Sequence, residues 1–118
     1  MLREWVEGYV RAWESNDSDD IEALFTEDAR YLTEPYATPW SGREAIVRKW
    51  LEHRDEPGDA TFSWEPVVEA PDIGVLQGRT VYRDPPRSYA NLWVIRFADD
   101  GRCSEFTEWY MEAPAASS

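Results

Sequence analysis

The sequence has 118 residues, 42% hydrophobic and 14% aromatic, so it can fold around one hydrophobic core but not two. Its formal net charge of −12 argues against a nucleic-acid partner and against an anionic membrane surface, because both carry negative charge. A single cysteine excludes an intrachain disulfide, and with a single histidine no residue spacing suggests a metal site. We therefore expect a globular protein without a metal or another cofactor.

The start of the chain is amphipathic rather than uniformly apolar. The segment MLREWVEGYV carries charges where a signal peptide would be hydrophobic, and no segment approaches the roughly eighteen apolar residues of a membrane span. We expect a cytoplasmic protein with no membrane contact. One domain is expected over residues 1–112, followed by a small polar tail, 113–118, that is expected to be disordered.

Helical periodicity dominates the first half of the chain. Apolar residues between Leu2 and Trp13 recur at helical spacing, and the cluster 15–17 ends this helix and caps a short second one. Residues 29–34 are expected to be extended and 35–39 to form a loop.

A third helix is predicted by the motif Ser41-Gly42-Arg43-Glu44. This motif fits a capping box, in which two side chains satisfy free backbone donors at a helix start. The buried side of this helix is expected to carry Ile46, Val47, Trp50 and Leu51.

After residue 58 the apolar period changes from near four to two, which predicts a series of β-strands. The expected strands are about 60–69, 73–84, 88–98 and 102–112. Pro66 predicts a bulge or an edge position in the first of them. Helices gathered on one face of an antiparallel sheet make an α+β fold, and we expect three N-terminal helices packed on a curved antiparallel sheet.

The last two strands indicate which side chains face the hollow of that sheet. Asp100-Gly101 between alternating apolar segments is a strong hairpin signal, because both residues tolerate positive φ. A hairpin closed there predicts these pairs: Phe97 with Ser104, Arg96 with Glu105, Ile95 with Phe106, Trp93 with Glu108 and Asn91 with Tyr110. One face then holds a carboxylate and an amide among aromatic rings. A register slip of one residue would exchange the two faces.

The opposite face of the hairpin has the character of an outer surface. Arg96 and Glu105 form a predicted cross-strand ion pair on it. Cys103, beside the turn, is expected on this outer face and is expected to be chemically inert.

Four segments resemble the nuclear transport factor 2-like, or SnoaL-like, superfamily, which includes ketosteroid isomerases and polyketide cyclases. They are YVRAWESND in the first helix, IEALFTEDARYLTEP after it, PWSGREAI before the third helix, and the terminal hairpin. The resemblance covers residues 2–112 and implies a cone-shaped α+β barrel around an apolar cavity. It also implies a homodimer through the outer sheet face, which suits the apolar outer residues Leu92, Val94, Trp109 and Met111.

The same resemblance implies roles for two residues. The isomerases use a tyrosine of the first helix as an oxyanion donor, and Tyr9 is similar in position. They use an acid before a proline as a base, and Glu34 before Pro35 is similar, although one residue out of register. A second carboxylic acid that they carry on a late strand is replaced here by Trp93.

Glu108 is the candidate base that the hairpin itself provides. If Glu108 points inward among the rings, burial raises its pKa toward the range useful for proton transfer. A solvent-exposed glutamate at a sheet edge is the alternative. Tyr9 is buried on either interpretation, and its hydroxyl meets either a ligand or a backbone carbonyl. Asn91 suits either orienting a ligand or bridging to a strand end.

Aromatic residues are expected to form the cavity wall, with ordinary core packing as the alternative for each. The candidate ligand-binding residues are Trp13, Tyr31, Trp50, Asn91, Trp93, Phe106 and Tyr110, with Trp40, Trp64 and Tyr82 as further wall candidates. His53, placed on the buried side of the third helix, is more typical of a cation at a helix C-terminus than of a catalyst.

Three classes of function remain open. The first is a cofactor-independent isomerase or cyclase that acts on an apolar carbonyl compound, with Glu108 or Glu34 as base and with Tyr9 and Asn91 holding the oxyanion. The alternative is a non-catalytic dimeric module that binds an apolar or aromatic ligand, or a protein-interaction domain. The ionisation state of the inward carboxylate separates enzyme from binder. The size of the cavity separates both from an interaction domain.

Overall fold

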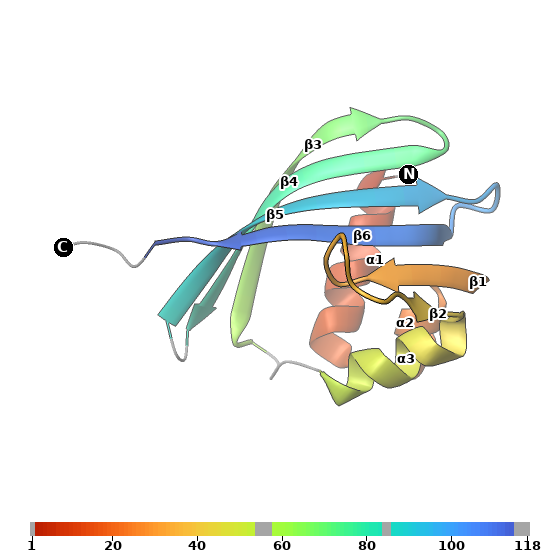
Figure 1. The fold of residues 1–118 in the computed structure, drawn as a ribbon, viewed down its shortest axis with the longest axis horizontal. Coiled ribbons are helices and arrows are strands. Elements are labelled where there is room, and N and C mark those ends of the chain that lie inside the picture. The colour runs from red at the N-terminus through yellow and green to blue at the C-terminus, as the bar shows by residue number, and fades with distance from the viewer. Residues whose placement is uncertain (1, 54–57, 84–85, 115–118) are drawn as a thin grey trace.

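The computed structural model describes residues 2–53, 58–83 and 86–114. Within these residues, three helices lie against one face of a strongly curved six-stranded sheet (Figure 1). The elements are α1 (Leu2–Ser15), α2 (Ser18–Glu22), β1 (Phe25–Leu32), β2 (Trp40–Ser41), α3 (Arg43–Glu52), β3 (Ala60–Glu69), β4 (Ile73–Arg83), β5 (Pro86–Phe97) and β6 (Cys103–Glu112). The predicted α+β architecture is therefore confirmed.

The sheet is mixed in its strand directions. In the described part of the chain its order is β2-β1-β6-β5-β4-β3, and all neighbours are antiparallel except β1 and β6, which are parallel. The parallel pair departs from the wholly antiparallel sheet that the sequence predicts. No hairpin turn connects β1 to β6, so nothing forces these two strands to run in opposite directions.

The predicted register of the terminal hairpin is confirmed over most of its length. Trp93 pairs with Glu108, and the paired strands continue in step from there to Arg96 and Glu105. The cavity face and the outer face are therefore assigned as predicted along this stretch.

Near the turn the register prediction is wrong. Phe97 pairs with Cys103 rather than with Ser104, after a register shift. The Gly101 N–H donates to the Ala98 carbonyl at 3.0 Å, and Gly101 has φ 85°. This is the geometry of a turn followed by a glycine bulge, which takes up one residue more than the predicted two-residue turn.

The shift turns Cys103 into the core. Its side chain is fully buried, so the expected outer-face position is wrong. Burial also raises the pKa of the Cys103 thiol well above its usual range, because the thiolate would lose its hydration.

Helix α1 fills the concave face of the sheet, and β3 to β6 bend around it (Figure 1). Its apolar stripe is buried at Leu2, Trp5, Val6 and Tyr9. The Trp5 indole N–H donates to the Leu24 carbonyl at 2.9 Å, which satisfies the polar atom of this buried ring. The predicted first helix and its inward face are thus confirmed.

Helix α3 begins without the predicted capping box. Its N-cap is Gly42, at φ 91°, and no side chain caps the helix. Ser41 instead belongs to β2 and pairs with Arg30, while the Gly42 N–H donates to the Ala29 carbonyl at 2.8 Å. The backbone of Ser41 is therefore held in strand pairing, and Ser41 cannot adopt the position at the helix start that a capping box requires.

Two other local predictions are confirmed, whereas the strand expected over residues 29–34 begins earlier, as β1 (Phe25–Leu32). Asp17 is the N-cap of α2, and its carboxylate accepts from the Asp19 N–H at 2.8 Å. Edge strand β3 has a register shift between Pro66 and Val68, as expected for a proline bulge. The expected disordered tail falls mainly on residues 115–118, which lie outside the described residues.

The outer face of the sheet combines apolar and charged residues. Trp109 and Met111 are exposed there by 49% and 74%. The structure places the ion pair of Glu105 with Arg30 of β1, at 3.2 Å, rather than with the predicted Arg96. Because β1 lies beside β6, a cation of β1 reaches this carboxylate, and the sequence could not reveal that neighbour.

Candidate functional site

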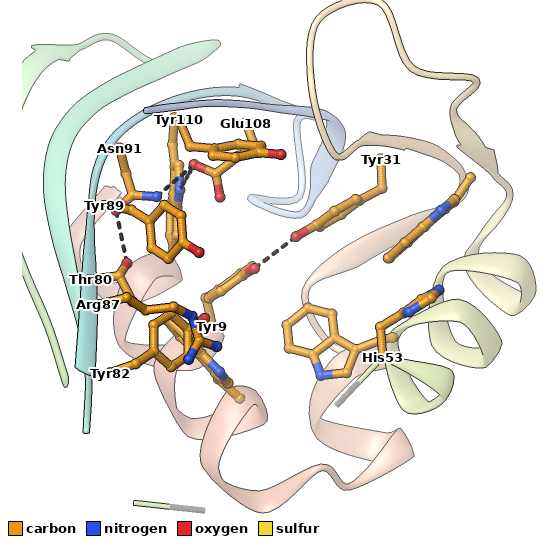
Figure 2. A pocket seen from close by; sticks show the side chains of 14 residues that line it. Tyr9, Tyr31, His53, Thr80, Tyr82, Arg87, Tyr89, Asn91, Glu108 and Tyr110 are labelled. Atoms are coloured by element: carbon orange, nitrogen blue, oxygen red, sulfur yellow. Dashed lines mark hydrogen bonds between the residues drawn. The ribbon is translucent and has the colours of Figure 1, made fainter. Parts of the chain in front are cut away.

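A cavity of about 360 Å³ lies between the concave face of the sheet and helices α1 and α3. This volume falls within the roughly 300–1,000 Å³ typical of small-molecule sites. Most of the predicted site residues line it, namely Tyr9, Trp13, Tyr31, Trp50, Asn91, Trp93, Glu108 and Tyr110. Residues from both ends of the chain therefore meet around one space (Figure 2).

Glu108 is held by two hydrogen-bond donors. The Trp93 indole Nε1 donates to Glu108 Oε2 at 2.8 Å, and the Asn91 amide Nδ2 donates to the same oxygen at 3.0 Å. Burial raises the pKa of Glu108 to about 7, although both hydrogen bonds act in the opposite direction by stabilising the carboxylate. Glu108 therefore exchanges a proton close to neutral pH.

The two donors also decide which oxygen of Glu108 carries that proton. An indole N–H and an amide N–H can only donate, so Oε2 must accept in both protonation states. The proton therefore resides on Oε1. Figure 2 shows the carboxyl group directed into the cavity, with both dashed lines to it ending on one oxygen. Glu108 thus presents its titrating oxygen to the cavity.

Thr80 fixes the orientation of the Asn91 amide. The Thr80 hydroxyl donates to Asn91 Oδ1 at 2.8 Å, which leaves the Asn91 NH₂ group directed at Glu108. Thr80 is only 4% exposed, so this hydrogen bond is shielded from competing water. Thr80, Asn91 and Glu108 lie on three adjacent strands, and the first two side chains together position the carboxyl group of the third.

Tyr9 and Tyr31 form the second polar group of the cavity. Their hydroxyls lie 2.8 Å apart, and both rings are buried. Burial raises the pKa of both phenols above the usual range; Tyr31 and then the Glu108 carboxylate add to this for Tyr9, and Glu108 does so for Tyr31. Both phenols therefore stay protonated, and whichever hydroxyl accepts the shared hydrogen bond keeps its own proton for a third group.

Aromatic rings make up most of the remaining wall. Tyr9 packs against Trp50 and Trp93, with ring centroids 4.9 and 4.5 Å away. The Trp40 ring stacks on that of Tyr31, with centroids 4.7 Å apart, and also lies parallel to the His53 ring at 6.1 Å. These rings give the cavity flat apolar surfaces suited to an apolar or aromatic ligand.

Three predicted site or wall residues do not line the cavity, namely Glu34, Phe106 and Trp64. Trp64 instead packs against the core, with the Arg3 guanidinium over its ring. Glu34 is exposed in the segment after β1. Phe106 is fully buried behind the cavity, where its ring stacks on those of Tyr9 and Tyr31. His53 does line the cavity, but its side chain is exposed at the C-cap of α3, so its predicted position on the buried side of the helix is wrong.

Three cavity residues were missed from the sequence: Thr80, Arg87 and Tyr89. The alternation that places Asn91 and Trp93 inward, continued backward along β5, also places Tyr89 and Arg87 inward. Thr80 pairs with Tyr89 across β4 and β5. The signal was therefore present, but it depended on knowing that this strand continues to Pro86.

Among residues 2–53, 58–83 and 86–114, no group of three His, Cys, Asp or Glu side chains is placed to hold a metal ion. No helix in those same ranges is long and apolar enough to cross a membrane.

The family model of the SnoaL-like domain matches residues 6–106 of this chain. A comparison with curated proteins finds no match. Among solved structures, a Kribbella flavida protein provisionally named a ketosteroid isomerase superposes with a TM-score of 0.71 at 19% identity, over 98% of this chain and 82% of that one. An NTF-2 like protein of unknown function from Burkholderia xenovorans also gives 0.71, at 18% identity over 97% and 88%. A ketosteroid isomerase-like protein from Erwinia carotovora gives 0.66, at 16% identity over 95% and 94%.

Proposed function

The chain belongs to the SnoaL-like family, and from that premise we propose that it moves a proton next to the carbonyl group of an apolar compound, with Glu108 as the acid and base. One observation carries the proposal: a carboxyl group with a pKa of about 7 that faces an aromatic cavity. A general base works best when its pKa lies near the working pH. Isomerisation of an enone and aldol-type cyclisation both need this step.

In the proposed reaction, Glu108 Oε1 removes a proton from the carbon beside the carbonyl. Negative charge then develops on the carbonyl oxygen, and the tyrosine pair supports it by donating a hydrogen bond from Tyr9 or Tyr31. Glu108 returns the proton at another carbon or at the same carbon, which completes the transfer without a net change in the protein.

Asn91 has a different role from the predicted one. Its NH₂ group donates to Glu108, and its carbonyl accepts from Thr80. Asn91 is therefore a positioning residue for the base rather than an oxyanion donor. The exposed location of Glu34 favours Glu108 over Glu34 as the base.

The first test needs no substrate. The ¹³C chemical shifts of the glutamate carboxyl groups are followed from pH 4 to pH 9, and the Glu108 signal is assigned by its absence in Glu108→Gln. We expect a midpoint near 7. A midpoint near the ordinary glutamate value would remove Glu108 as the base and leave ligand binding without catalysis as the better interpretation.

The second test measures proton transfer directly. Exchange of the acidic C–H groups of 2-tetralone in D₂O is followed by NMR with the wild-type protein, Glu108→Gln and Glu65→Gln. Glu65 is exposed on β3, so its variant has the same charge change away from the cavity. We expect Glu108→Gln to lose roughly a hundredfold or more of the catalysed rate and Glu65→Gln to keep it. Equal rates in both variants would contradict the assignment.

We also propose that two copies associate through the outer sheet face. Apolar side chains exposed on that face include Val68, Val81, Trp109 and Met111. Burial of exposed apolar side chains is favourable, so a face that carries several of them favours contact with a second copy of the chain. Light scattering after gel filtration should give twice the 13.8 kDa chain mass for the wild-type protein and the single mass for Trp109→Glu. A monomeric wild-type protein would contradict this proposal.

A further inference from the structure

Glu108 is a partly buried carboxyl group whose partners in the described part of the chain are all neutral. Its two hydrogen bonds come from the Trp93 indole and the Asn91 amide. The ion pairs found among the described residues do not include it. Burial outweighs both hydrogen bonds in setting its pKa, so its charged form is incompletely compensated. A positive charge carried in by a ligand would complete that compensation.

One oxygen of this carboxyl group is left for a ligand. Trp93 and Asn91 both donate to Oε2, and Figure 2 shows the carboxyl group directed into the cavity. Oε1 can therefore accept a hydrogen bond from a donor that enters the cavity. When Glu108 is ionised, a charged donor binds there more strongly than a neutral one.

Aromatic rings lie close to the carboxyl group. The Trp93 ring, whose N–H binds Glu108, lies 4.5 Å from the ring of Tyr9, and the Tyr9 ring lies 4.9 Å from that of Trp50. All three rings line the cavity. The faces of Trp and Tyr rings attract an ammonium group within about 6 Å. A carboxylate beside such rings is therefore suited to an organic cation.

Two described lining residues can carry positive charge, and both lie away from Glu108. Arg87 is four residues from Asn91 on the same face of β5, about 13 Å along the strand, and its guanidinium carbon lies 4.1 Å from the ring centroid of Tyr82. His53 lies at the C-cap of α3. Figure 2 shows both apart from the hydrogen-bonded group around Glu108. The other titratable groups among the described lining residues are phenols, so none of these residues places a cation against Oε1.

The charge of the whole chain acts in the same direction. Acidic residues outnumber Lys and Arg by 24 to 12, which gives the formal net charge of −12. A field of this sign raises the local concentration of cations and speeds their approach. It acts on every cation alike, whereas Glu108 and the rings around it decide which cations bind in the cavity.

We propose that the cavity binds a protonated organic amine, with its ammonium group paired to Glu108 Oε1 and its apolar body against the aromatic wall. This inference goes beyond the proposed proton transfer and does not depend on it, because the ion pair uses Glu108 as a charge rather than as a base. An amine bound in this way occupies Oε1. It would therefore inhibit the proposed proton transfer by competing with the carbonyl compound.

The test compares two probes of similar shape, 1-naphthylmethylamine and 1-naphthylmethanol, at pH 8. Their dissociation constants are measured by titration calorimetry for the wild-type protein, Glu108→Gln and Glu65→Gln. Glu65 is exposed on β3, so its variant makes the same charge change away from the cavity. We expect the wild-type protein and Glu65→Gln to prefer the amine by roughly tenfold. Glu108→Gln should lose the preference and still bind the alcohol, because a glutamine oxygen can accept the bonds from Trp93 and Asn91.

A second measurement follows Glu108 itself in the wild-type protein. The midpoint of its ¹³C carboxyl titration is recorded with each probe at saturation. The amine should move the midpoint below about 7, because it binds the ionised form preferentially, and the alcohol should not. An amine that left the midpoint in place would contradict an ion pair at Glu108.

Three binding results would also overturn the inference. They are equal binding of amine and alcohol by the wild-type protein, a preference that survives in Glu108→Gln, and no binding of either probe. None of them decides the proton-transfer proposal, which is judged by the Glu108 titration in the free protein. Failure of that proposal would appear as an ordinary midpoint in the free protein, and such a carboxylate would still distinguish the amine from the alcohol.

Discussion

Trp93 and Glu108 are partners in the β5–β6 ladder, and the indole of the first donates to the carboxyl group of the second at 2.8 Å. Strand register alone therefore places a donor against the proposed base. At the position where the resemblance to isomerases implies a second carboxylic acid, this chain has an indole that binds the base. Trp93 cannot supply the acidic proton of that second carboxyl group, which leaves oxyanion support to the tyrosine pair.

Replacing Trp93 by Phe should raise the pKa of Glu108 above about 7. The variant keeps an aromatic ring but removes the N–H that stabilises the carboxylate. The measurement is the NMR titration of the Glu108 carboxyl group. Trp5→Phe is the matched control, because its indole N–H binds the Leu24 carbonyl instead. An unchanged midpoint in Trp93→Phe would show that the hydrogen bond has no influence on the titration.

Replacing Thr80 by Val should both destabilise the protein and raise the pKa of Glu108. The substitution removes the hydroxyl that fixes Asn91 and leaves a partly buried amide oxygen without its donor, at a cost of about 1 kcal/mol in the free energy of unfolding. Urea unfolding and the Glu108 titration measure the two effects. Thr61→Val, on the exposed side of β3, should change neither. A Thr80 variant that lost stability without moving the titration would limit Thr80 to a structural role.

The stability of the protein should fall as the pH rises through the titration of Glu108. Its pKa is raised from 4.5 to about 7 in the folded state, so between these values the folded protein binds more protons than the unfolded chain. The contribution is fully present below pH 4.5 and is lost by about pH 7, a change of about 3 kcal/mol at 1.36 kcal/mol per pKa unit. Urea unfolding at pH 5 and pH 8 should show this loss in the wild-type protein but not in Glu108→Gln. Parallel pH dependence in the two proteins would contradict it.

Cys103 should be unreactive in the folded protein. Its side chain is fully buried, and burial raises the pKa of its thiol, so the reactive thiolate is both inaccessible and scarce. Ellman's reagent should modify it only as fast as the protein opens, and immediately in denaturing urea. Since Cys103 is the one cysteine of the sequence, the unfolded chain serves as its own reference. Rapid modification under native conditions would place the thiol at the surface.

Local patterns predicted the elements well, because alternation and helical spacing depend only on near neighbours. The inward face of α1 and the pairing of Trp93 with Glu108 both followed from such patterns. The predictions were wrong where two alternative conformations compete for the same segment of backbone. The predicted capping box at Ser41 does not form because Ser41 pairs with Arg30. The predicted two-residue turn is replaced by a turn with a glycine bulge at Gly101.

The site was predicted in part for the same reason. Glu108 and Asn91 were identified because they share one face of a hairpin, but their mutual hydrogen bond was not foreseen. Thr80 was missed because its importance lies in a contact with the neighbouring strand. The contact between Tyr9 and Tyr31 joins residues of different elements, and no periodicity within either one reveals it.

The sequence by itself determined the three helices, the last four strands, the hairpin register near Glu108 and the resemblance to a family. Only the tertiary structure decided that Glu108 faces a cavity with two donors on one oxygen, that Arg87 joins it there, and that Glu34 does not. The physical reason is that side-chain direction follows from local backbone geometry, whereas burial, and with it the pKa of Glu108, depends on which distant segments exclude water from the same space.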